Sequence, residues 1–128
     1  MQAEAFEGAN AIARHSAEGV VVAGTEHRSS VVVPWRGAVA AWRPGAFDQL
    51  EEPDFAALLG WKPELIVFGS GARLRFPHPS LLRPLIERRI GIETMDTAAA
   101  CRTYNVLLAE GRGVVAALLF GAAPERGA

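Results

Sequence analysis

The chain has 128 residues, of which 50% are hydrophobic, and its formal net charge is −1. A chain of this length and composition can bury a core of its own, so one folded domain over residues 1–128 is expected and a disordered chain is excluded. The nearly neutral charge argues against a nucleic-acid-binding function, which needs a basic face to displace counterions from phosphates.

The cysteine and hydropathy patterns bear on the cellular compartment. Cys101 is the only cysteine, which rules out an intramolecular disulfide and suits a reducing environment. No apolar run approaches the roughly 18 residues of a membrane-spanning helix, and no basic leader precedes an apolar segment at the start of the chain. The sequence therefore predicts a cytoplasmic protein with no membrane span.

The first third of the chain has the pattern of β structure. Two apolar, β-branched runs at residues 19–24 and 29–34 are separated by the polar stretch 25–28, which predicts a hairpin or a meander. Residues 39–42, between two prolines, are expected to form a third short strand. This β-rich N-terminal part extends over about residues 12–43 and precedes an α/β part over about residues 46–121.

The α/β part begins with apolar positions between residues 47 and 59, which predict one or two helical turns. Pro53 can begin the second turn, because the first N–H groups of a helix have no partner within it. The apolar run at residues 65–68 shows no alternation and ends at Gly69, as expected of a strand covered on both faces. Residues 79–89 predict a helix whose apolar side chains face inward: Leu81, Leu82, Leu85 and Ile86.

A second strand-to-helix unit follows. Residues 90–95 predict a strand, and Asp96 or Thr97 can cap a helix that runs to about Glu110 and ends at Gly111. Residues 114–120 predict the last buried strand. The order of strands and helices in this half, with its short connections, predicts that these strands pair in parallel.

Two loops in this part predict a crevice. In an open α/β sheet, ligands collect where loops leave the carboxyl ends of parallel strands. Loops 69–73 and 95–97 each follow a strand, so they face each other if these strands are neighbours. The glycines of residues 69–71 fit a plain tight turn or, alternatively, the close approach of a backbone to an anion. No dinucleotide-binding, P-loop or nucleophile-elbow motif is complete here.

The predicted helix at 97–110 carries polar side chains beside its apolar ones. A helix N-terminus and Arg102 would lower the pKa of Cys101, but a cysteine in an alanine-rich helix more often packs as a small apolar group. Arg102 is expected to pair with a carboxylate such as Asp96, Glu93 or Glu110, and Asn105 to bind backbone groups of the adjacent loop. The same groups also suit a small anionic ligand. The residues of the candidate ligand site are Gly69, Ser70, Gly71, Arg73, Asp96, Thr97, Arg102 and Asn105.

No catalytic residue, metal site or cofactor is predicted. The histidines are scattered and have no carboxylate or cysteine at the spacing of a metal site. Trp35, Trp42 and Trp61 are expected to cover the core or the sheet edge. Trp35 and Trp42 also flank proline-rich segments, and aromatic side chains are enriched at protein interfaces, so the β-rich part is one candidate for a partner surface.

Three segments together resemble the Mth938-like (DUF498) domain family: residues 63–71, residues 91–97 with Met-Asp-Thr, and residues 100–112 with Arg-Thr-Tyr-Asn-Val-Leu. The resemblance covers nearly the whole chain. It implies a three-layer α/β fold with a central mixed, mostly parallel sheet, helices on both faces, additional N-terminal β structure and one antiparallel strand. The positions that match those shared in the family are Gly69, Gly71, Met95, Asp96, Thr97, Ala100, Arg102, Tyr104, Asn105, Glu110 and Arg112.

The resemblance implies no catalytic mechanism. The family includes a mitochondrial protein needed for assembly of respiratory complex I, together with many members without an assigned activity. The first hypothesis is therefore a non-catalytic, assembly-factor-like protein that acts through an unknown protein partner. The alternative is a domain, conceivably an enzyme, that binds a small anionic molecule in the crevice between loops 69–73 and 95–97. The composition also allows a homo-oligomer.

Overall fold

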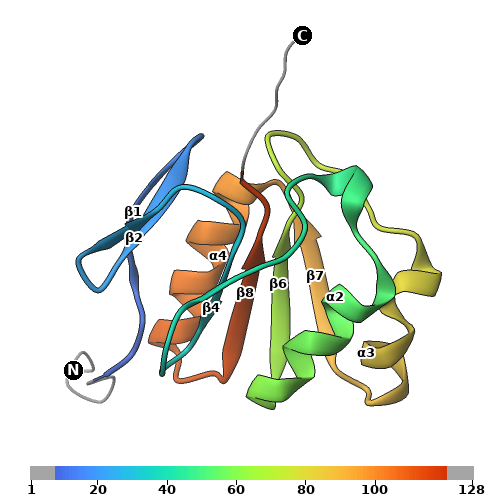
Figure 1. Cartoon of the computed structure of the whole chain (residues 1–128). Coiled ribbons are helices and arrows are strands. Elements are labelled where there is room, and N and C mark those ends of the chain that lie inside the picture. Colours follow the sequence, from blue (N-terminus) through green and yellow to red (C-terminus); the bar gives the residue numbers. More distant parts are fainter. Residues whose placement is uncertain (1–7, 121–128) are drawn as a thin grey trace, which may run out of the picture.

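Two β-sheets with helices around them make up the computed structural model, which describes residues 8–120 (Figure 1). The smaller sheet has the order β1-β2-β3, and the larger has the order β5-β4-β8-β6-β7. The strands are β1 (Ile12–Ser16), β2 (Gly19–Val22), β3 (Thr25–His27), β4 (Val31–Pro34), β5 (Ala40–Ala41), β6 (Leu65–Gly69), β7 (Gly91–Met95) and β8 (Val114–Leu118). The helical elements, with η for 3₁₀ turns, are η1 (Phe47–Gln49), α2 (Glu52–Ala56), η2 (Ala57–Trp61), η3 (Pro79–Leu82), α3 (Arg83–Glu87) and α4 (Thr97–Ala109).

The larger sheet is mixed. β6 pairs in parallel with both β7 and β8, which confirms the parallel pairing predicted for the second half of the chain. β4 pairs antiparallel with β8 on one side and with β5 on the other, so β4 alone runs against its neighbours in this sheet. This is the mixed, mostly parallel arrangement that the family resemblance implied.

Helices cover both faces of this sheet, which gives three layers (Figure 1). The side chains of β6 alternate between two cores: Val67 packs in the core with Tyr104 of α4, whereas Phe68 packs in the core with Phe55 of α2. All four of these side chains are fully buried. A strand that is covered on both faces needs apolar residues at every position, which explains the unbroken apolar run at 65–68.

The prediction that residues 19–24 and 29–34 pair as a hairpin is wrong, because these two runs belong to different sheets. The alternative, a meander, forms as β1-β2-β3 and includes only the first run. The polar stretch between them contains β3, which pairs with β2, while β4 pairs with β8 far along the chain. The turn from β2 to β3 consists of Ala23 and Gly24, both with positive φ (50° and 82°). Two positive φ values fit the right-handed twist of paired strands, so the turn favours β3 despite its polar composition.

The predicted helix at 79–89 forms as two short pieces, η3 and α3. Leu85 is fully buried and Leu81 and Leu82 are half-buried, but Ile86 is 60% exposed, so its predicted inward position is wrong. A 3₁₀ turn has three residues per turn, and its change to α-helix at Arg83 shifts the phase of the buried side.

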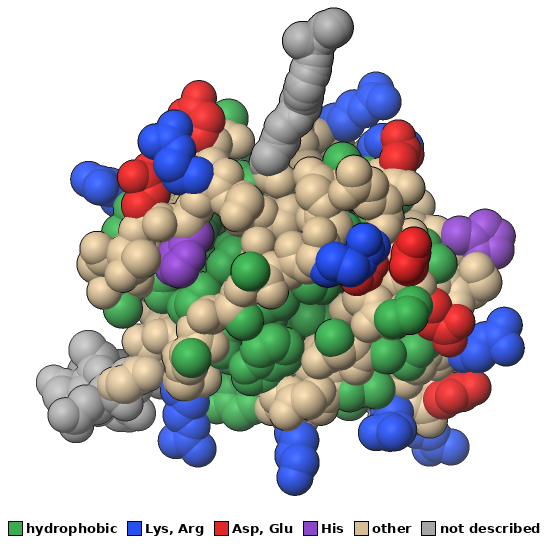
Figure 2. All heavy atoms as spheres, viewed as in Figure 1, with side chains coloured by type: hydrophobic (Ala, Val, Ile, Leu, Met, Phe, Trp, Pro, Cys, Tyr) green, Lys and Arg blue, Asp and Glu red, His purple; other side chains and the backbone are tan. Residues whose placement is uncertain are grey.

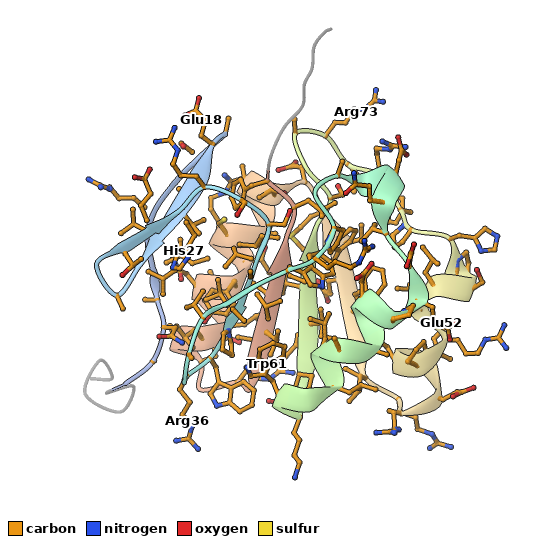
Figure 3. All side chains as sticks on the ribbon, viewed as in Figure 1. Glu18, His27, Arg36, Glu52, Trp61 and Arg73 are labelled. Carbon is orange, nitrogen blue, oxygen red and sulfur yellow. The ribbon has the colours of Figure 1, made fainter. Side chains whose placement is uncertain are left out.

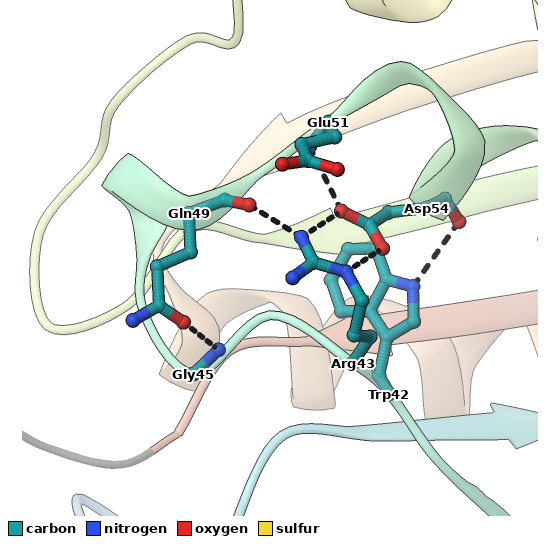
Figure 4. A network of polar contacts seen from close by, with 6 residues as sticks. All are labelled: Trp42, Arg43, Gly45, Gln49, Glu51 and Asp54. Carbon is teal, nitrogen blue, oxygen red and sulfur yellow. Dashed lines mark hydrogen bonds and ion pairs between the residues drawn. The ribbon is translucent and has the colours of Figure 1, made fainter.

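An ion pair fixes the segment between β5 and α2 (Figure 4). Arg43 donates from Nε to Asp54 Oδ1 at 2.7 Å and from Nη2 to Asp54 Oδ2 at 2.6 Å, and it also donates to the carbonyl oxygen of Gln49. The Glu51 backbone N–H donates to Asp54 Oδ2 at 2.8 Å, which completes the N-terminal cap of α2. The hydrogen bonds from Arg43 lower the pKa of the Asp54 carboxyl below its ordinary value, although burial acts in the opposite direction.

Replacing Asp54 with asparagine should lower the free energy of unfolding by about 1–2 kcal/mol at neutral pH, because charge-assisted hydrogen bonds are lost from a buried carboxylate. A carboxyl with a depressed folded-state pKa stabilises the fold above its unfolded-state pKa, and this contribution is lost as the pH falls through the folded-state pKa. The difference between wild type and Asp54→Asn in urea unfolding should therefore shrink below about pH 4.

The matched control is Asp48→Asn, since Asp48 pairs with Arg75 at 3.1 Å but its side chain is 83% exposed. Exposed ion pairs contribute little, so this change should cost well under about 1 kcal/mol. A cost for Asp54→Asn that stays constant down to acid pH would contradict the assigned role of the carboxylate.

Candidate functional site

A groove of about 830 Å³ lies where the parallel strands β6, β7 and β8 end. Its walls are residues 15–17 of the small sheet, residues 45–47, residues 70–73 and 75 of the loop after β6, residues 96–98 at the start of α4, and residues 119–120 after β8. The predicted loops 69–73 and 95–97 are therefore neighbours. The candidate ligand residues that line this groove are Ser70, Gly71, Arg73, Asp96 and Thr97.

The two loops are joined directly to each other. The Ser70 N–H donates to the carbonyl oxygen of Met95 at 2.9 Å, and the Thr97 N–H donates to that of Gly71 at 2.9 Å. The Thr97 hydroxyl accepts the Gly71 N–H at 2.8 Å and donates to the carbonyl oxygen of Leu119 at 3.1 Å. These bonds close the crevice between the loops, so the open groove lies above them.

Packing and turn geometry account for both glycines of the loop after β6. A Cβ on Gly69 would lie 2.9 Å from Thr97 Cα, so no larger residue fits between β6 and the start of α4. Gly71 has a φ of 111°, which L side chains rarely adopt. Gly69 is thus required for the close approach of two backbone segments, and Gly71 for the conformation of the turn.

The polar side chains at the base of the groove have partners within the protein. Ser70 is 3% exposed, and its hydroxyl donates to the carbonyl oxygen of Arg73 at 2.8 Å and accepts the Arg75 N–H at 3.0 Å. Asp96 is the N-cap of α4, since its Oδ1 accepts the Ala99 N–H at 2.8 Å. These hydrogen bonds hold the loops in place.

Arginine side chains supply the charge at the edge of the groove. Arg75 lies over the ring of Phe47, with 4.2 Å from Cζ to the ring centroid, and pairs with Asp48. Arg73 extends outward from the loop after β6 (Figure 3), and its guanidinium forms no ion pair or hydrogen bond within residues 8–120. Arg73 is therefore the cation most available to a bound molecule.

Arg102 and Asn105 lie outside the groove lining. Asn105 instead binds β1: its Oδ1 accepts the Ile12 N–H at 2.9 Å and its Nδ2 donates to the Ile12 carbonyl oxygen at 2.9 Å. Arg102 is exposed, and the expected ion pair with Asp96 is absent among the residues that the structure describes. The preceding residue, Cys101, faces the core, so the Arg102 side chain points toward solvent. The Asp96 carboxylate instead accepts the Ala99 N–H at the start of α4.

Cys101 is fully buried on the core side of α4. Burial raises the pKa of its thiol to about 12, and the nearby positive charge of Arg102 offsets only part of this effect. The thiol is therefore neutral at physiological pH, as expected for a cysteine that packs as a small apolar group.

Tyr104 joins the same helix to two other parts of the chain. Its hydroxyl lies 2.8 Å from the carbonyl oxygen of Asn10 and 3.0 Å from that of Pro34, and the side chain is fully buried. Tyr104 and Asn105 thus attach the N-terminal β structure to α4. The periodicity of the helix indicated an apolar face, but it did not indicate these hydrogen-bond partners. They lie 70 to 94 residues away from Tyr104 in the sequence.

The tryptophans divide between core and surface. Trp42 is buried against Phe55 and Phe68, and its indole N–H donates to the carbonyl oxygen of Asp54 at 3.2 Å. Trp35 and Trp61 are half-buried, and Trp61 lies at the end of the molecule opposite to Arg73 (Figure 3). Hydrophobic side chains gather in the middle of the face seen in Figure 2, with charged side chains around its rim.

Within residues 8–120, no group of three or more His, Cys, Asp or Glu side chains is placed to hold a metal ion. In the same part of the chain, every helix is too short or too polar to cross a membrane.

Replacing Asn105 with alanine should lower the free energy of unfolding by about 2 kcal/mol, because both backbone groups of Ile12 lose their side-chain partner. Hydrogen exchange should show faster exchange of amides in β1 than in β6. The matched control is Val106→Ala on the same helix, since Val106 is 57% exposed. Unchanged exchange in β1 of the Asn105→Ala variant would show that other contacts hold this sheet.

Comparisons with known proteins agree with the fold. A family model described as a protein of unknown function, DUF498/DUF598, matches residues 12–119. The chain is 36% identical, over 84 residues, to the NADH dehydrogenase (ubiquinone) 1 alpha subcomplex assembly factor 3 of Bos taurus. The match includes 64% of this chain and 46% of that protein, so the chain spans about half the length of the assembly factors it matches.

Solved structures extend the similarity over most of the chain. A crystal structure of a Bordetella parapertussis protein superposes with a TM-score of 0.84 at 32% identity, covering 89% of this chain and 98% of the other. The solution structure of a Mth938-like domain from Bordetella pertussis superposes with a TM-score of 0.77 at 28% identity, covering 86% and 85%. The chain therefore belongs to the DUF498/DUF598 family and has the Mth938-like fold.

Proposed function

We propose that this protein is a non-catalytic interaction domain that takes part in the assembly or maturation of a larger complex. The observation that carries this proposal is the use of the polar side chains at the strand ends. Ser70, Asp96, Thr97 and Asn105 all form hydrogen bonds within the protein, so they act as scaffold.

The names of the relatives support the kind of partner. Assembly factor 3 of NADH dehydrogenase matches this chain in cattle and in other animals at 30–36% identity. The family model covers residues 12–119, so most of the 84 residues matched in the assembly factor lie in the family domain. A function common to both proteins therefore depends on the contacts of this domain. Subunits of a respiratory NADH dehydrogenase are accordingly the first partners to test.

The same proposal includes the cellular location of the protein and its contacts with a partner or a second copy. We place the protein in the cytoplasm, acting as one domain over residues 1–128 with its partner at or near a membrane. Half-buried Trp35 and Trp61 and the apolar area in Figure 2 are compatible with contact to another protein, including a second copy of this chain.

A second candidate function is the binding of a small anionic molecule. The groove volume of about 830 Å³ lies within the usual range of ligand sites, roughly 300–1,000 Å³. Arg73 at its edge would pair with the negative group. The hydroxyl groups of Ser70 and Thr97 are used within the protein, which weakens this candidate, because small-molecule sites normally present several polar groups that orient the ligand.

Deletion of the gene from its own organism tests the assembly function. We expect a several-fold loss of fully assembled NADH dehydrogenase on native gels stained for activity, with smaller intermediates in its place. Wild-type protein and the surface control Arg83→Glu should restore assembly, whereas Asn105→Ala should restore it poorly if β1 must be held in place. Normal amounts of assembled enzyme in the deletion strain would contradict the proposal.

A further inference from the structure

We propose that the groove at the strand ends binds an extended segment of the partner protein that carries apolar side chains next to at least one carboxylate. The inference rests on the proposed interaction function and names the surface and the chemistry of the partner. It is drawn from the shape, charge and hydrogen bonding of the groove.

The groove is hollow because small residues surround it. Its lining includes Ala17, Ala46, Ala72 and Ala98, all exposed, while the larger apolar side chains Leu119 and Phe120 lie buried at its base. Phe47 adds an aromatic wall. A surface with room between small side chains, an apolar base and an aromatic wall suits a side chain such as leucine or phenylalanine from a partner.

Charged side chains at the edge of the groove determine which charge a partner segment should carry. Arg73 and Arg75 both line the groove, but Arg75 already pairs with Asp48, so Arg73 supplies the guanidinium that is free to pair with a ligand. The Asp96 carboxylate lies at the N-terminus of α4 and accepts the Ala99 N–H there, so the helix dipole offsets part of its charge. His15 adds a polar group on the opposite wall. The unpaired guanidinium of Arg73 therefore favours a carboxylate over a cation at this edge, and arginine suits carboxylates through its paired donors.

The base of the groove favours a peptide over a small polar molecule. Ser70 and Thr97 use their hydroxyl groups within the protein, so the base offers apolar contact and few free polar groups. A partner segment satisfies these conditions because its side chains supply the apolar contact and its carboxylate pairs at the edge. The loops that form the groove are cross-linked by hydrogen bonds, so the site is formed before binding and little order must be imposed on it.

Selection of short random peptides displayed on phage, with the full chain as bait, tests the inference. We expect enriched peptides to combine Asp or Glu with Leu, Phe or related residues. Synthetic copies should bind about tenfold more weakly to Arg73→Glu, and their affinity should fall as salt is raised. The matched control is Arg83→Glu, an exposed arginine on α3 outside the groove, which should bind as wild type does.

A second pair of variants separates charge from shape. Ala98 is exposed at the start of α4, where Glu is favourable to the helix, so Ala98→Glu should fold normally and yet repel an acidic peptide. Ala98→Gln has nearly the same size, so it should retain clearly more affinity than Ala98→Glu. Equal loss in both variants would show that the negative charge of the ligand is unimportant.

Several outcomes would overturn the inference. Enriched peptides without an acidic bias, peptides that bind Arg73→Glu as tightly as wild type, or a selection that enriches nothing would each do so. Binding of octanoate but of no peptide would assign the groove to a small molecule, and a dimer in sedimentation that Arg73→Glu dissociates would assign it to a second copy. If the Arg73→Glu protein still restores NADH dehydrogenase assembly in the deletion strain, the groove assignment fails while the assembly function stands.

Discussion

The hydrogen bonds of Thr97 hold the ends of three parallel strands together. Its hydroxyl bonds the loop after β6 at Gly71 and the residue after β8 at Leu119, and Thr97 itself directly follows β7 and Asp96. A further bond from the Leu119 N–H to the Gly69 carbonyl oxygen closes the same junction. Loops at the carboxyl ends of strands are often mobile, but here they are joined to one another and to the first turn of α4. The groove above them is consequently a fixed feature of the fold.

This junction explains why residues that the sequence indicates as ligand-binding candidates have a structural role. Two loops can meet at the end of a sheet only if their backbone N–H and carbonyl groups find partners, because unpaired buried polar groups are costly. Ser70, Asp96 and Thr97 supply those partners, and Gly69 leaves the space for them. Asn105 does the same at the other side of α4, where it pairs with Ile12 as a neighbouring strand would.

How far the sequence predicts this protein depends on how local each interaction is. β6 and β8 were predicted correctly because each contains an unbroken apolar run, and α4 because adjacent residues supply its N-cap. β7 was also predicted correctly, although its sequence contains polar residues. β3 was missed because its pairing depends on the Ala23-Gly24 turn rather than on its own composition. Five of the candidate site residues line one groove, because parallel strands end at the same edge of a sheet. His15 and Phe47 also line it, but they come from distant segments, so no local sequence pattern indicates them. Arg102 was assigned to the site because its neighbours are polar, whereas its position one residue after buried Cys101 directs it to solvent.

The separation between a rigid base and an edge of small and charged side chains has a functional consequence. Substitution of the residues that hold the strand ends should destabilise the fold, because each satisfies backbone groups there. The edge of the groove consists of side chains that do not hold the strand ends. These are the exposed alanines at positions 17, 46, 72 and 98 and the guanidinium of Arg73. The surface that they form can therefore vary while the scaffold stays the same. A domain of this kind can present different recognition surfaces on one fold.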